Sequence, residues 1–413
     1  MRNGRLLQRM CERCQQVPSS ALPLLVGCLA TILATSLASG TAAQSRLSAL
    51  PAKSPAPLDN PSTPERVALG RLLFWDPILS GQKDVACATC HHPSFGYSDG
   101  LDLSIGANGA GLGPARTFVS GHEPRLVKRN SQTVLNAAFN GLSADGHSNP
   151  AAAPMFWDLR VRSLEAQALE PLKAQDEMRG GTYPEDHAVA NVVARLNDIP
   201  EYRRLFARAF AETKLVTERN LGRALAAFER TLVASNTPFD RYMRGDTTAL
   251  SAEQVRGMER FQSIGCINCH SGPMFSDFAT HVIAVPDNPK LPISDAGVNK
   301  TYAFRTPSLR NLGATAPYMH NGMFGSLQEV VAFYRRISGG GGRRGGGRAG
   351  VINPEVSRDQ IDPLARQLNM RGGGQGDLIA FLRALDDPDF DRAIPDRVPS
   401  GLSVGGQLQS STR

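Results

Sequence analysis

The sequence predicts a mainly α-helical protein that consists of two similar halves. Apolar residues recur at helical spacing in several segments, whereas strand signals are scarce, with one short hairpin expected around His281–Val285. The same order of features occurs twice: a predicted helix, a glycine and then the pentapeptide Cys-x-x-Cys-His. With 413 residues, of which 41% are hydrophobic, the chain is long enough for two domains.

The two pentapeptides begin at Cys87 and Cys266. This pattern is the attachment motif of c-type haem, because two thiols form thioethers to one porphyrin and the next residue offers its imidazole to the iron. A single copy would also fit a zinc half-site or a redox-active cysteine pair, but two copies without another cysteine after residue 43 favour haem. We therefore expect two cytochrome c-like helical domains, each with one covalently bound c-type haem. The attaching residues are Cys87, Cys90, His91, Cys266, Cys269 and His270.

Residues 1–43 have the pattern of a signal peptide. A basic segment from Arg2 to Arg13 precedes an apolar run from Ala21 to about Ala38, and small residues precede a cleavage site at Gln44. An uncleaved membrane anchor and a lipoprotein attached at Cys28 are the alternatives. Export would place the mature chain in the periplasm, where haem is attached through thioethers. No disulfide is expected, because the other three cysteines lie in the leader.

The net charge gives no support for nucleic-acid binding. The whole chain carries +7, and four Arg and one Glu in the leader account for +3, which leaves about +4 for the mature chain. Haem propionates would reduce this further. No stripe of Lys and Arg with interleaved aromatic residues is present, so we expect no nucleic-acid partner.

Composition and turn signals divide the rest of the chain. Residues 44–62 are rich in Ser, Ala and Pro and are expected to form a flexible arm. Residues 63–245 are expected to form an N-terminal haem domain. Residues 246–395 would form a C-terminal haem domain with a flexible Gly/Arg-rich insertion at 339–350. Residues 396–413 are expected to be a disordered tail.

Capping residues mark where several helices begin. Thr63 caps a helix that Asp76-Pro77 ends, and Ser251 forms a capping box with Gln254 three positions later. The other expected helices span 217–233, which is the clearest, 186–196, 202–210, 376–385, and an amphipathic segment from about 163 to 171.

A haem whose iron has one protein ligand is open for reaction, whereas a haem with two ligands is closed and transfers electrons. Peroxide cleavage at an open haem needs an acid/base group, and Glu177 is the best carboxylate for it, since burial would raise its pKa. Trp157 suits an electron relay between two porphyrins. The ordinary alternatives are a solvated glutamate and a core aromatic residue. Candidates for a second iron ligand, each alone more often structural, are His122, His147, His187, His281, His320, Met319, Met323 and Tyr334.

Several motifs together resemble a known family, the bacterial di-haem cytochrome c peroxidases and the related MauG proteins. The resemblance covers roughly residues 60–390. Beyond the two haem motifs, it rests on the segments Arg129–Asn136, Phe156–Arg160, Glu177-Met178, Pro238–Tyr242, Arg305–Asn311 and Ala316–Gly322.

The resemblance implies a division of labour between two haems. The N-terminal, peroxidatic haem on His91 would react with peroxide, and the C-terminal haem on His270 would handle electrons. Trp157 would be the tryptophan between the haems, and Glu177 the catalytic glutamate. A calcium ion would be held by Asn130, Thr315 and Pro317, whose amide and carbonyl oxygens are suitable hard ligands.

Two positions concern a second ligand to iron. His122 lies eight residues before Asn130, at a distance similar to that of the peroxidase histidine that caps the first haem in the inactive state. Tyr334 stands where the peroxidases have a methionine ligand to the second haem, and MauG-type members use a tyrosine there. A phenolate stabilises higher iron oxidation states than a thioether does, so it should lower the reduction potential of the second haem. This conflicts with the usual peroxidase scheme, in which the second haem has a high potential.

Three functions follow from the resemblance and the residues. The first is a periplasmic peroxidase that reduces hydrogen peroxide with electrons from a soluble cytochrome c or a cupredoxin. The second is a MauG-like enzyme that uses high-valent iron to oxidise Tyr or Trp residues of a partner protein. The third is a plain electron carrier with both irons closed. The oligomeric state stays open, a homodimer included.

Overall fold

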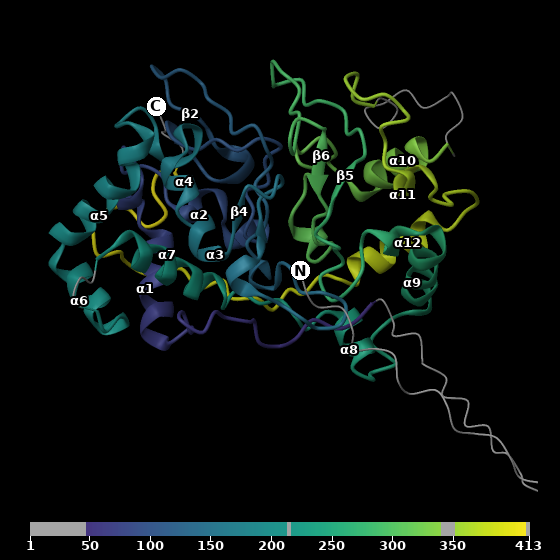
Figure 1. Ribbon diagram of the computed structural model, residues 1–413, viewed down its shortest axis with the longest axis horizontal. Coiled ribbons are helices and arrows are strands. Elements are labelled where there is room, and N and C mark those ends of the chain that lie inside the picture. Colours follow the sequence, from purple (N-terminus) through teal and green to yellow (C-terminus); the bar gives the residue numbers. More distant parts are fainter. Residues whose placement is uncertain (1–46, 213–215, 340–351, 410–413) are drawn as a thin grey trace, which may run out of the picture. The chain divides into compact units, whose positions relative to one another are not determined.

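Helices predominate in the structure, a computed structural model that describes residues 47–212, 216–339 and 352–409 (Figure 1). The mainly α fold class is thus confirmed. The helices are α1 (Pro64–Trp75), α2 (Cys87–Cys90), α3 (Leu164–Gln167), α4 (Glu170–Lys173), α5 (Ala188–Asp198), α6 (Pro200–Ala209), α7 (Glu218–Glu229), α8 (Pro238–Met243), α9 (Ala252–Ile264), α10 (Leu327–Ile337), α11 (Pro363–Arg366) and α12 (Gln375–Arg383). Within the described ranges, no helix has the length and hydropathy to cross a membrane.

In the described part of the chain, three small antiparallel sheets of two strands each accompany the helices. They pair β1 (Gly109–Ala110) with β2 (Thr117–Phe118), β3 (Pro154–Met155) with β4 (Val161–Arg162), and β5 (Thr280–Val282) with β6 (Ala303–Arg305). The strand expected near His281 is present, but its partner is β6, so the predicted hairpin within 281–285 is wrong. Its register places His281 opposite Phe304.

In the first half, α1 and α7 pack closely against each other at Gly70. A Cβ at Gly70 would lie only 1.9 Å from the carbonyl oxygen of Ala224, so no larger residue fits without a shift of the backbone. Four residues further along each helix, the rings of Phe74 and Phe228 meet edge to face, with centroids 5.2 Å apart. This contact lies at the centre of a hydrophobic core that α5 and α6 complete.

The second half repeats this arrangement between α9 and α12. A Cβ at Gly257 would lie 1.9 Å from the Asp377 carbonyl oxygen. Four residues further along, Phe261 and Phe381 meet edge to face with centroids 5.4 Å apart. In both halves the helix with the glycine precedes a Cys-x-x-Cys-His motif. The duplicated helical architecture that the sequence predicts is therefore visible in the packing itself.

The capping predictions are confirmed, and one helix prediction is partly wrong. Thr63 caps α1, and Ser251 with Gln254 forms a capping box at the start of α9. The amphipathic helix expected over about 163–171 is instead two single-turn helices, α3 and α4. Pro171 lies in the first turn of α4, where its fixed φ favours a new helix start and its missing N–H is not needed.

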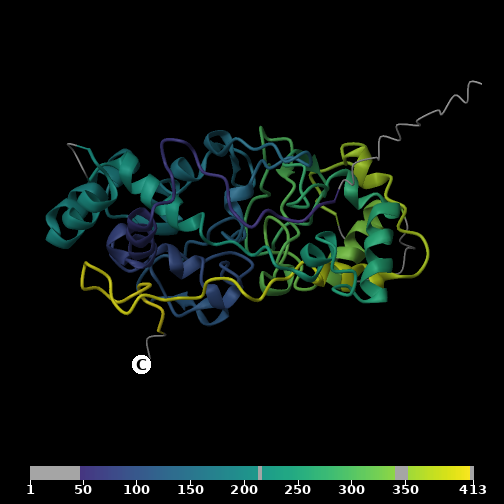
Figure 2. The same cartoon turned by 90° about the horizontal axis from the view of Figure 1, so that it is seen from below.

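The arm and the described part of the tail both contain residues that contact the rest of the protein. In the arm, Leu47 and Leu50 are buried, and the Leu50 backbone N–H donates to Asp240 Oδ1 at 2.8 Å. In the tail, the Gly405 N–H donates to the Trp75 carbonyl at 2.7 Å, so residues 396–409 run back beside the first half (Figure 2). The predictions of a flexible arm and a disordered tail are wrong for these residues, because their scattered apolar side chains find places in the cores.

The predicted signal peptide and nearly all of the Gly/Arg-rich insertion lie outside the described residues. The boundary at residue 245 between the two haem domains stays a prediction.

Candidate active site

One cavity of about 660 Å³ brings most of the predicted site residues together. Both Cys-x-x-Cys-His motifs line it, with apolar side chains from both cores between them. The predicted residues in its wall are Cys87, Cys90, His91, Asn130, Trp157, Glu177, Cys266, Cys269, His270, Thr315, Pro317 and Tyr334. His122 is the exception: it is exposed and does not line the cavity, so it would reach the first haem only if its loop moved.

The first motif is arranged as a haem-binding histidine requires. Helix α2 ends at Cys90, and the His91 backbone N–H closes the turn on the Cys87 carbonyl at 2.9 Å. His91 Nδ1 lies 3.1 Å from the Tyr97 carbonyl oxygen, which fixes the ring as an Nδ1–H donor. Burial lowers the pKa of His91, so its Nε2 lone pair is available to a metal at neutral pH.

The second motif repeats this geometry. His270 Nδ1 lies 2.9 Å from the Phe275 carbonyl oxygen, and burial lowers the pKa of His270 as well. Burial raises the pKa of Cys90 and of Cys266 to about 12, so these thiols are poor thiolate ligands for zinc. Uncharged sulfurs beside a neutral imidazole in an apolar cavity fit two covalently attached haems.

Glu177 lies on a π-helical turn that spans Gln175–Arg179. The backbone at Gly106 packs closely against this turn, because a Cβ at Gly106 would lie 2.3 Å from the Glu177 carbonyl oxygen. Burial raises the pKa of Glu177, while the charge of Arg160 opposes this. Arg160 itself lies flat on Phe156, with the guanidinium carbon 3.6 Å from the ring centroid. The arrangement holds a carboxyl group with a raised pKa in the cavity wall.

Trp157 belongs to an aromatic group in the cavity wall. Its indole lies edge to face with His320, with centroids 6.5 Å apart, and His320 stacks on Phe304 at 3.7 Å. Burial lowers the pKa of His320 to about 3, so this ring is neutral. His320 was one of several candidate second ligands by sequence, but here its ring is committed to stacking.

Tyr334 projects from α10 into the wall of the cavity and contacts the core beside the second motif. Burial, with the Cys269 and Cys266 sulfurs, raises its pKa, so a phenolate would form only if a cation such as iron replaced the proton. The hydroxyl is thus a sound candidate for a second ligand to the iron at His270.

The three predicted calcium ligands all line the cavity, and no hydrogen bond joins any two of these described residues. Asn130 donates its side-chain amide to the Leu101 carbonyl at 2.8 Å, which leaves its Oδ1 to accept a cation. The Thr315 hydroxyl donates to the Asn311 carbonyl at 3.2 Å. The calcium site stays a prediction.

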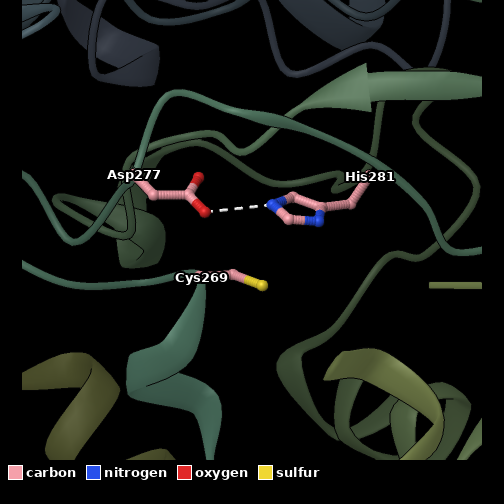
Figure 3. Close-up of side chains that lie close together, drawn as sticks. All are labelled: Cys269, Asp277 and His281. Atoms are coloured by element: carbon pink, nitrogen blue, oxygen red, sulfur yellow. Dashed lines mark hydrogen bonds and ion pairs between the residues drawn. The ribbon is translucent and has the colours of Figure 1, made fainter. Parts of the chain in front are cut away.

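Sequence reasoning missed an ionic cluster beside the second motif. His281 Nε2 lies 3.0 Å from an Asp277 oxygen (Figure 3). On the other side of the ring, His281 Nδ1 lies 2.7 Å from an Asp362 oxygen. Hydrogen bonds to Asp277, Cys269 and Asp362 raise the pKa of His281 to about 11, so the ring is a cation. Cys269, Asp277 and His281 also have the donor atoms of a metal site, but a thioether bond to haem would occupy the Cys269 sulfur.

Two further groups in or near the cavity wall were not predicted. Arg129 pairs with Asp158 and with Asp295, each at 2.6 Å.

Glu229, at the end of α7, is buried, and burial raises its pKa to about 8. Helical periodicity marked the segment of Glu229 as buried, but nothing in the sequence showed that this glutamate lines the cavity.

Comparison with known proteins identifies related chains. A family model described as di-haem cytochrome c peroxidase matches residues 64–248. The methylamine utilization protein MauG of Methylorubrum extorquens is 36% identical over 84% of this chain and 87% of that protein. The cytochrome c551 peroxidase of Pseudomonas aeruginosa is 35% identical over 76% of this chain and 85% of its own. The solved structure of a MauG-like protein associated with microbial copper homeostasis matches with a TM-score of 0.64 and 26% identity, over 82% of this chain and 95% of that one.

Proposed function

Because the chain belongs to the di-haem cytochrome c peroxidase family, we propose that it is a periplasmic peroxidase that reduces hydrogen peroxide to water. Its electrons would come from a small redox protein, a soluble cytochrome c or a cupredoxin. One observation carries this proposal: Glu177 shares a cavity wall with Cys87, Cys90 and His91, and burial raises its pKa.

Cys87, Cys90 and His91 would hold a haem, which would supply the iron at which peroxide binds. Glu177 takes the proton from the near oxygen of peroxide on its carboxylate and returns it to the far oxygen, which leaves as water. A carboxyl whose pKa lies above the ordinary range performs both steps near neutral pH. Arg160, held on Phe156, limits that rise through its positive charge.

His270 would hold the haem that receives electrons, and Trp157 would relay them toward the haem held by His91. His320 and Phe304 continue the aromatic contact from Trp157. Asn130, Thr315 and Pro317 would hold a calcium ion beside this contact. His122 would cap the first haem only in a resting form with a rearranged loop.

A Glu177→Gln variant tests the assigned role. General acid/base catalysis typically contributes about 10²- to 10⁴-fold, so peroxide turnover should fall by about that factor while both haems stay attached. Glu185→Gln is the matched control, because Glu185 is exposed and its replacement removes the same negative charge. Normal turnover in Glu177→Gln would remove this residue from the mechanism.

A second function is favoured by Tyr334, namely a MauG-like oxidation of Tyr or Trp residues in a partner protein. A phenolate ligand would stabilise a more oxidised second haem than a methionine would. Tyr334→Met and Tyr334→Phe should then both change the absorption spectrum of the second haem and shorten the lifetime of its oxidised form. If both spectra match the wild type, Tyr334 is not a ligand and this second function loses its motive.

A further inference from the structure

Four buried polar atoms without a hydrogen-bond partner belong to three residues at the end of α7 and on α3. They are Glu229 Oε2, Glu165 Oε2, and Nε and Nη1 of Arg230. Arg230 Nη2 donates to Glu165 Oε1 at 2.6 Å, so the last two residues are in direct contact. Leaving several buried polar atoms unpaired is costly, and donors and acceptors so arranged are the partners that bridging water requires.

The three residues range from the cavity wall to the surface, and the charges of Arg230 and Glu165 both act on Glu229. At the inner end, Glu229 lines the cavity that holds the first motif, and its charge is the main electrostatic influence on Cys87. Arg230, in the middle, has a side chain that is only 1% exposed. At the outer end the Glu165 side chain is 20% exposed and is held by Asn60 Nδ2 at 2.8 Å.

The charges around Glu229 leave it able to change protonation near neutral pH. Burial raises its pKa to about 8, Arg230 lowers it and Glu165 raises it. From α2 it faces Cys87, which is uncharged as a thioether. From α1, Arg71 lies over Phe228 and pairs with Asp391. Among the residues that the structure describes, none forms an ion pair with Glu229, and its Oε2 accepts no hydrogen bond. A change of charge in the cavity would therefore shift its proton occupancy.

We propose that Glu229 takes up a proton from solvent, through Glu165 and water bound at Arg230, when an electron reaches the haem attached at Cys87. The step balances: one electron from the donor converts Fe(III) to Fe(II), and one solvent proton forms an O–H bond on the Glu229 carboxylate. The proposal rests on haem attachment at the first motif, which is part of the proposed function. It is independent of Glu177 and of peroxide turnover.

A redox titration of the haem-loaded protein between about pH 6 and pH 10 tests the coupling, because this range spans the pKa of Glu229. The potential of the first haem should fall as pH rises in the wild type and should become independent of pH in Glu229→Gln. Glu218→Gln, an exposed change on the same helix, should keep the wild-type slope. An unchanged slope in Glu229→Gln, or loss of the slope in Glu177→Gln alone, would overturn the proposal.

Infrared difference spectra between oxidised and reduced protein give a second test that does not depend on the variant's folding. At about pH 9 the wild type should gain the carbonyl band of a protonated carboxylic acid on reduction. Absence of this band in the wild type would overturn the proposal. Glu165→Gln should keep the band but slow proton uptake, followed with a pH-indicator dye. Uptake as fast as in the wild type would exclude the route through Glu165.

Discussion

Trp157 donates its indole N–H to the backbone carbonyl of Asn130 at 3.1 Å. The backbone N–H of Asn130 in turn donates to the carbonyl of His320 at 2.8 Å. The tryptophan is therefore fixed by a segment next to the first motif, while its neighbour His320 comes from the segment near the second. This pair of hydrogen bonds gives the indole one orientation within the cavity wall, which electron transfer between two fixed haems requires.

Replacing Trp157 with Phe should slow electron transfer between the haems on the order of tenfold, because the shorter ring loses both the hydrogen bond and the contact with His320. Stopped-flow oxidation of the reduced protein by peroxide would follow each haem separately. Trp75→Phe is the control, since Trp75 is fully buried but does not line the cavity. An equal loss of rate in both variants would show that any loss of packing slows electron transfer, and would contradict a specific pathway through Trp157.

The two glycine contacts predict matched losses of stability. Gly70→Ala and Gly257→Ala would each place a methyl group 1.9 Å from a backbone carbonyl oxygen, so the helices must separate. Overpacking of this kind typically lowers the free energy of unfolding by about 1–3 kcal/mol. Denaturant unfolding measures it, with Gly181→Ala as control, because no atom lies within 4 Å of a Cβ there. Stability equal to that of the control would contradict the observed packing.

The ionic cluster at His281 predicts a dependence of stability on pH. Its pKa rises from 6.5 to about 11, chiefly through Asp277, so the stabilisation is complete below about pH 6.5 and is lost as pH rises toward 11. Asp277→Asn should therefore reduce the free energy of unfolding most near pH 6.5, and the two proteins should converge as pH approaches about 11. Urea unfolding across this range measures the difference, with the exposed Asp186→Asn as control. A difference that grows with pH would contradict the account.

The sequence predicted best what repeats or follows a strong local rule. The haem motifs, the caps at Thr63 and Ser251, and the helical periodicity over 217–233 all involve residues that are neighbours in the chain. The contacts that complete the site join distant segments: His281 contacts Asp362, and Arg230 contacts Glu165. Such pairs leave no local pattern in the sequence. The same holds for the C-terminal segment, which was expected to be disordered, whereas the Gly405 N–H donates to the Trp75 carbonyl.

Peroxide turnover with reduced cytochrome c tests the central claim most directly. It should be measured on the fully oxidised protein and again after one-electron reduction, while the spectra of both haems are recorded. The account predicts fast turnover, with Glu177 required. Little turnover in either state, together with a long-lived oxidised species formed directly from the oxidised protein, would contradict the peroxidase function and favour oxidation of a partner protein.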